Sequence, residues 1–121
     1  MNMKKILKIL DTLSEETRMR VFLLLINGDL CVCELVNILN MKQARISHIM
    51  KKLNDAGLAN SKRDGKWIIY SAKPEALKLG VVKSILDDLK ISMSDLKKMR
   101  KCKNDRIKET CCKQVVRYAH G

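Results

Sequence analysis

The chain has 121 residues, a length that fits one domain. Its 25 Lys and Arg against 13 Asp and Glu give a net charge of +12, which favours a polyanion partner such as nucleic acid, although a solubility surface or a basic tail would also produce it. The sequence contains no apolar run near the ~18–20 residues of a membrane span and no convincing signal peptide, so we expect a cytoplasmic protein without a membrane partner.

The first half of the chain is predicted to be helical. Residues 3–10 form a short amphipathic segment, and a second helix follows Ser14, a plausible N-cap, and is closed by Gly28. A third helix is expected at residues 31–40 and a fourth at residues 42–57.

The fourth helix separates an apolar stripe from a polar outer face. Ile46, Ile49, Met50 and Leu53 recur at spacings of three and four, which predicts that they are buried. The outer face and flanks offer Arg for guanine, Gln for adenine and Lys for phosphates, as a helix in a major groove requires; a solvated surface helix is the alternative. The candidate DNA-binding residues on this helix are Gln43, Ala44, Arg45, Ser47, His48, Lys51 and Lys52.

The context of this helix favours DNA binding. Only the three residues "NMK" separate it from the third helix, the short turn of a helix-turn-helix. A β-hairpin follows, with Asp64-Gly65 as the predicted two-residue turn and Lys62, Arg63 and Lys66 near its tip, where they can reach the DNA. We therefore predict a mainly α fold with a β-hairpin wing, a winged helix-turn-helix.

The C-terminal part is predicted to begin with one long helix from Pro74 to about Arg100. Its apolar stripe either docks onto its own domain or, as we prefer, pairs with a second copy to form a homodimer through the terminal helices. Residues 1–100 would then form the DNA-binding and dimerisation domain, and residues 101–121 a basic, cysteine-containing tail. The stripe consists of Val82, Ile85, Leu89, Met93 and Leu96.

The "CVC" sequence places two thiols at the expected start of the third helix. Cys31 and Glu34 have the spacing of a capping box, but a thiol is a poor N-cap, so we expect Cys31 to have another use. The positive end of the helix should lower the thiol pKa. On a regular helix, residues two apart point about 200° from each other, so a shared ion would unwind the first turn and misplace the DNA-reading face. Two buried structural cysteines are the alternative.

These motifs together resemble the arsenic-repressor (ArsR/SmtB) family of metal-sensing repressors. The order "LSEETRMRVFLLLINGDLCVCELVNILNMKQARISHIMKKLNDAGL" and then "KRDGKWIIY" covers about residues 5–95, and "DLCVCEL" is similar to that family's metal-binding box. The resemblance implies a cytoplasmic homodimer that binds double-stranded operator DNA and releases it when metal binds, with no small-molecule substrate.

The odd number of cysteines, five, argues against a disulfide framework and favours a soft metal or metalloid. As(III) prefers three thiolates, and Sb(III) would suit the same ligands. Cd(II) or Pb(II), which take a fourth thiolate, are the alternative inducers. Two further alternatives are a thiol redox switch and a non-sensing architectural DNA-binding protein. The third ligand would come from the tail of the same or the partner chain, unless the tail forms a separate site. The spacing of Cys111 and Arg117 is that of a phosphatase loop, but the segment has no Gly and no preceding strand, so we predict no enzyme. The candidate metal ligands are Cys31, Cys33, Cys102, Cys111 and Cys112.

Overall fold

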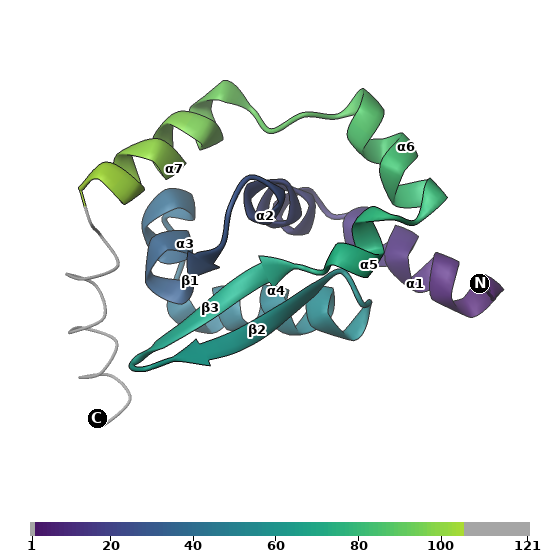
Figure 1. Ribbon diagram of the computed structural model, residues 1–121, viewed down its shortest axis with the longest axis horizontal. Helices are drawn as coiled ribbons and strands as arrows, with labels where there is room; N and C mark the ends of the chain where they lie inside the picture. The colour runs from purple at the N-terminus through teal and green to yellow at the C-terminus, as the bar shows by residue number, and fades with distance from the viewer. Residues whose placement is uncertain (1, 106–121) are drawn as a thin grey trace.

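The structure is a computed structural model that describes residues 2–105, in which helices surround a small antiparallel sheet (Figure 1). The fold is that of a mainly α winged helix-turn-helix, as the sequence predicts. The helices are α1 (Met3–Leu13), α2 (Glu16–Ile26), α3 (Val32–Leu39), α4 (Gln43–Asp55), α5 (Pro74–Leu77), α6 (Gly80–Asp88) and α7 (Met93–Asn104). The strands are β1 (Leu30–Cys31), β2 (Ala59–Asp64) and β3 (Trp67–Ala72).

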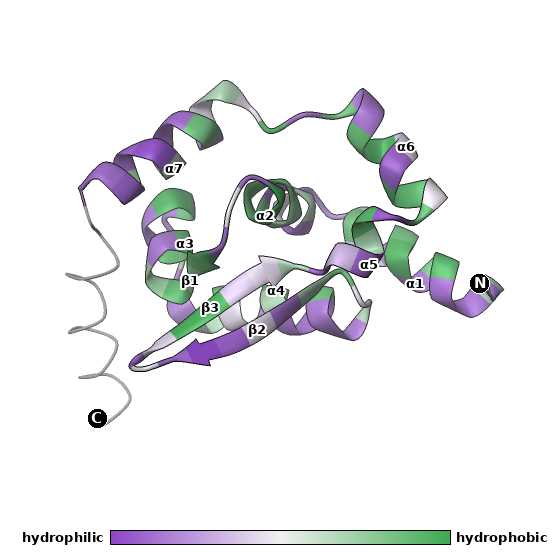
Figure 2. Ribbon diagram, in the orientation of Figure 1, coloured by the Kyte–Doolittle hydropathy of each residue, from purple (hydrophilic) through white to green (hydrophobic). Residues whose placement is uncertain are grey.

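Helix α2 lies at the centre of the domain. It contacts α1, α4, α7 and β3, and Phe22 and Leu24 within it are fully buried. Figure 2 shows α2 as hydrophobic along most of its length, whereas β2 is strongly hydrophilic. The core therefore consists mainly of aliphatic side chains around α2, with Phe22 as a buried aromatic residue, and the cationic strand β2 projects from it as the wing.

The N-cap of α2 is Glu15 and not Ser14, so that prediction was wrong. The Glu15 carboxylate accepts hydrogen bonds from the backbone N–H groups of Thr17 at 3.1 Å and Arg18 at 2.9 Å, which lower the pKa of Glu15. Ser14 instead ends α1, and its hydroxyl donates to the carbonyl of Asp11 at 2.6 Å. Ser14 lies between the end of α1 and the start of α2, and its side chain caps the end of α1.

The sheet has the order β1-β3-β2, with all neighbours antiparallel. In the wing, Asp64 pairs with Trp67, so the two loop residues are Gly65 and Lys66 and not the predicted Asp64-Gly65. Gly65 has a φ of +61°, and Lys66 does not have a positive φ, the pattern of a type II′ turn with glycine first. This shift of one residue leaves Lys66 at the very tip of the hairpin.

The predicted long helix from Pro74 to about Arg100 was wrong, because the chain forms α5, α6 and α7 in its place. After α6, Leu89 is extended, with φ −125° and ψ 120°. Ser92 then caps α7, since its hydroxyl accepts a hydrogen bond from the backbone N–H of Asp95 at 3.1 Å. The Ser-x-x-Asp pattern in "SMSD" is a helix start that the continuous apolar spacing concealed.

Helix α7 folds back onto its own domain beside α2 and α3 (Figure 1). Two nitrogens of the Arg20 guanidinium on α2 donate to the two carboxylate oxygens of Asp95, at 2.8 and 3.1 Å. This ion pair holds α7 against its own domain, but of the stripe residues in this part Leu89 and Met93 stay 41% and 62% exposed. Over residues 2–105, the helices are too short and too polar for any of them to cross a bilayer.

Candidate nucleic-acid interface and thiol site

Helix α4 has the amphipathic character predicted for a recognition helix. Its four apolar residues Ile46, Ile49, Met50 and Leu53 are buried, at most 5% exposed, and hold the helix against the core. The outer face is left for a partner. All candidate DNA-binding side chains of α4 and the wing are exposed, namely Gln43, Ala44, Arg45, Ser47, His48, Lys51, Lys52, Lys62, Arg63 and Lys66.

One of these residues is fixed by the wing. The hydroxyl of Tyr70 on β3 is hydrogen bonded to the side chain of Ser47 on α4, and partial burial raises the pKa of Tyr70 while that bond opposes the rise. A polar groove of about 200 Å³ lies between the two elements, and Lys51 and Asn60 are among the residues that line it. Tyr70 is not among the site residues predicted from the sequence, because only the three-dimensional contact reveals that it joins the wing to the recognition helix.

The two thiols of "CVC" face each other without any distortion of α3. Cys31 is the N-cap of α3 in an extended conformation, with φ −84° and ψ 165°, and only Cys33 lies on the helix. A hydrogen bond from Cys33 is the main cause that lowers the pKa of the Cys31 thiol, aided by the backbone N–H of Glu34 and opposed by burial and the Glu34 carboxylate. The predicted lowering is confirmed in direction. The separation of about 200° expected for two residues on a regular helix does not apply to this pair, because Cys31 lies outside the helix in an extended conformation.

Glu34 completes the predicted capping box and does more. Its carboxylate accepts a hydrogen bond from the backbone N–H of Cys31 at 3.0 Å, and it is only 1% exposed. Its second partner is Lys103 of α7, whose ammonium lies 2.9 Å from the other carboxylate oxygen and also donates to the carbonyl of Asp29 at 3.0 Å. The sequence predicted the first contact but not the second, which joins residues 69 positions apart in the chain.

The thiol pair is attached to the wing through the backbone. Cys31 pairs with Ile69 and Leu30 pairs with Tyr70 in the β1–β3 ladder. Because Tyr70 in turn contacts Ser47, a continuous series of contacts joins the first turn of α3 to the recognition helix α4.

The structure places the third cysteine that it describes near this turn. Cys102 lies on α7, is 1% exposed, and its Sγ is 4.0 Å from the carbonyl oxygen of Glu34. Within residues 2–105, no three His, Cys, Asp or Glu side chains are already gathered into a metal-binding arrangement. The predicted ligands Cys111 and Cys112 lie outside the described residues.

Comparison with known proteins agrees with this architecture. Residues 15–61 match the family described as bacterial regulatory protein, arsR family. The chain is 32% identical over 92 residues to the cadmium resistance transcriptional regulatory protein CadC homolog of Staphylococcus aureus, covering 75% of this chain and 76% of that protein. The chain belongs to the arsR family. Members of the arsR family are DNA-binding transcriptional regulators and not enzymes, as the sequence predicts.

Two further arsR-type comparisons cover parts of the chain. The arsenic resistance transcriptional regulator ArsR1 of Pseudomonas putida is 41% identical over 64 residues, which are 52% of this chain and 50% of that regulator. The solved structure of a possible transcriptional regulator for arsenical resistance superposes with a TM-score of 0.56 at 28% identity, over 65% of this chain and 80% of that one. The chain thus matches only about half the length of the arsenic regulator.

Proposed function

We propose that this arsR-family protein is a cytoplasmic repressor that binds operator DNA as a homodimer and releases it when As(III), or Sb(III), binds the thiolates of Cys31 and Cys33. The observation that carries the proposal is the pair of buried, mutually hydrogen-bonded thiols at the cap of the helix preceding the recognition helix. Two soft sulfur donors with one acidified thiol match the preference of trivalent arsenic for thiolates. The arsenic regulator from Pseudomonas putida supports the same class of inducer.

DNA binding follows from the exposed face of α4 and the wing. In the proposed complex α4 enters the major groove, where Arg45, Gln43 and His48 address base edges. Lys62 and Lys66 of the wing reach along the backbone or into the minor groove. The net charge of +12 favours the complex at low salt, because each neutralised phosphate releases condensed counterions.

Release follows from the position of Cys31. Its sulfur accepts the backbone N–H of Glu34 as part of the cap, so a bond from sulfur to arsenic weakens the cap of α3. The strain passes through the Cys31–Ile69 pair to the wing and through Tyr70 to Ser47. A coupling of about 1–3 kcal/mol, typical of allosteric effectors, is enough to change DNA affinity 5- to 150-fold. No unwinding of the first turn is needed, since the sulfurs already meet.

The homodimer is supported by apolar side chains that the described chain leaves exposed. On α1, Met3, Leu7 and Leu10 are 75%, 55% and 42% exposed and follow helical spacing along one face. Leu89 at the end of α6 and Met93 at the start of α7 are 41% and 62% exposed. A second copy covers such patches in the proposed dimer and places the two recognition helices one DNA turn apart. Leu7→Gln should lower the fraction of dimer, and with it the weight-average mass measured by sedimentation. The Lys8→Gln control on the same helix should leave both unchanged.

The test is arsenite-dependent release of a fragment selected from random-sequence DNA by the metal-free protein. Arsenite should raise the Kd of the wild type at least 5-fold. Cys31→Ser and Cys33→Ser should bind DNA normally but lose the response, and the exposed α3 variant Asn37→Ser should behave as wild type. A double cysteine variant that still releases DNA at the same arsenite concentration would refute the proposal. Release of DNA by peroxide but not by arsenite would establish a redox switch. If neither reagent releases the DNA, the protein is an architectural DNA-binding protein.

A Cd(II)- or Pb(II)-responsive repressor is the second candidate. The similarity to the cadmium regulator of Staphylococcus aureus, over three quarters of both chains, favours it. Competitive titration followed by thiolate–metal absorbance separates the two candidates, because cadmium and lead would recruit a fourth thiolate. A clear preference for cadmium over arsenite would replace the first candidate by the second.

A further inference from the structure

Cys102 occupies the inner face of α7, against the first turn of α3. Its side chain is 1% exposed, and its neighbour along that face, Met99, is 6% exposed. The 4.0 Å contact between its Sγ and the carbonyl oxygen of Glu34 places it next in space to the turn that carries Cys33. Cys31, Cys33 and Cys102 all belong to the same buried cluster, and none of the three forms a disulfide.

Two ion pairs hold α7 in this position, one near each end. Arg20 binds Asp95 in the first turn, and Lys103 in the last turn binds Glu34. Lys103 directly follows Cys102, so the ion pair fixes the thiol beside α3. The fold of the chain therefore holds the thiol of Cys102 beside the first turn of α3.

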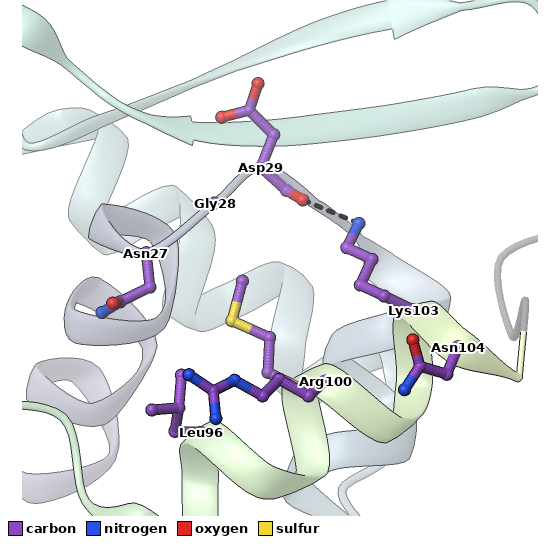
Figure 3. Close-up of a pocket in the computed structure, with 8 residues that line it drawn as sticks. Asn27, Gly28, Asp29, Leu96, Arg100, Lys103 and Asn104 are labelled. Carbon is purple, nitrogen blue, oxygen red and sulfur yellow. Dashed lines mark hydrogen bonds between the residues drawn. The ribbon is translucent and has the colours of Figure 1, made fainter.

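A surface groove lies beside this part of α7 and is lined by Met99 and Lys103, the buried neighbour of Cys102 and the residue that follows it. It has a volume of about 610 Å³ and runs between α7 and the loop that links α2 to β1. Figure 3 shows the Lys103 ammonium crossing its end to reach the carbonyl of Asp29, while Leu96 and Arg100 line the opposite side.

We propose that Cys102 of the same chain joins Cys31 and Cys33 as the third thiolate of a trigonal site for trivalent arsenic or antimony. The inference rests on the proposed function and specifies its ligand set. In the reaction with arsenous acid, three As–S bonds form and three As–O bonds break, and each departing hydroxyl leaves with one thiol proton as water, with no change in oxidation state. Since the described side chains are not yet gathered around an ion, binding must draw the end of α7 further toward the first turn of α3.

The ligand set is tested by X-ray absorption at the arsenic edge on the full-length chain with one equivalent of arsenite. The wild type and Cys111→Ser/Cys112→Ser should both show three sulfur neighbours. Cys102→Ser should show two sulfurs and one oxygen, with arsenite affinity reduced at least 100-fold and DNA release lost. Cys102→Ala serves as a second variant in case the hydroxyl of serine destabilises the buried position, and the unaltered wild type gives the sulfur count independently of folding.

Several outcomes would overturn the inference. Three sulfurs in the Cys102 variants, or loss of one sulfur in the tail double variant, would assign the third ligand to the tail. Normal arsenite response in Cys102→Ser together with its loss in Cys31→Ser would reject this inference and leave the proposed function intact. Absence of arsenic binding to the wild type would reject both.

Mixed dimers decide which chain supplies the sulfur. Protomers carrying Cys31→Ser/Cys33→Ser are refolded with protomers carrying Cys102→Ser. Ligation within one chain predicts no three-sulfur site in the mixture, as neither protomer holds all three thiols. Ligation across chains restores one site per mixed dimer, and its appearance would refute the same-chain assignment.

Discussion

Replacement of Asp95 by Asn should loosen α7 and lower the stability of the whole domain. The Asp95 carboxylate is 5% exposed and receives two charge-assisted hydrogen bonds from Arg20, at 2.8 and 3.1 Å. Asn keeps one oxygen acceptor but loses the charge and one of the two bonds. Arg20 is 35% exposed, so water solvates part of what is lost. The cost should lie between that of a surface pair and that of a fully buried one, at about 1–2 kcal/mol.

The assay is thermal unfolding followed by circular dichroism at 222 nm. For a domain of this size, about 1 kcal/mol corresponds to ~3–5 °C, so Asp95→Asn should lower Tm by about 3–10 °C. The control is Asp87→Asn on α6, which removes the same charge from an exposed position and should change Tm by less than about 2 °C. A double-mutant cycle with Arg20→Met isolates the pair, and the second change should cost little once the first is made. Equal Tm values for Asp95→Asn and Asp87→Asn would refute the claim that the ion pair stabilises the packing of α7 on the domain.

The remaining predictions concern pH and DNA recognition. Arg20 holds the pKa of Asp95 below its usual range, so the pair stabilises the protein above about pH 4, and its contribution is lost as pH falls through the lowered pKa. The difference in unfolding free energy between wild type and Asp95→Asn should therefore shrink between pH 6 and pH 3. A constant difference would contradict this prediction. Tyr70→Phe removes the hydroxyl that contacts Ser47. It should weaken binding to selected DNA about 3- to 10-fold, measured by anisotropy titration, without lowering Tm. An unchanged Kd would show that the contact does not contribute to DNA binding. Arg45→Ala should reduce the ratio of specific to non-specific affinity, while Lys66→Ala should weaken both alike and flatten the dependence on salt by about one unit of log–log slope.

Local patterns predicted the DNA-reading half of the fold well. The stripe of Ile46, Ile49, Met50 and Leu53 is a property of one helix and its spacing alone, and the structure buries all four. The box at Cys31 was also readable, because a capping interaction spans only three residues. These features depend on contacts between near neighbours in the chain, which a sequence displays directly.

Features that depend on competition or on distance were not predictable in this way. Gly65 can serve as either the first or the second residue of a hairpin loop, and the pairing of Asp64 with Trp67 decides between the two. The apolar spacing from Val82 to Leu96 continues across the break between α6 and α7, so periodicity could not find it. The contact of Lys103 with Glu34 joins residues 69 positions apart, and no local pattern announces it.

The placement of Cys31 in β1 makes the proposed arsenic ligand a member of the same sheet as the wing. A substitution in β1 or β3 that alters how tightly the gene is silenced will also alter how strongly it is induced, since both depend on one short ladder. Leaky expression and weak induction should consequently appear together in variants of this strand. Engineers seeking a biosensor with a lower background would do better to change the outer face of α4, which shares no backbone pairing with the thiols.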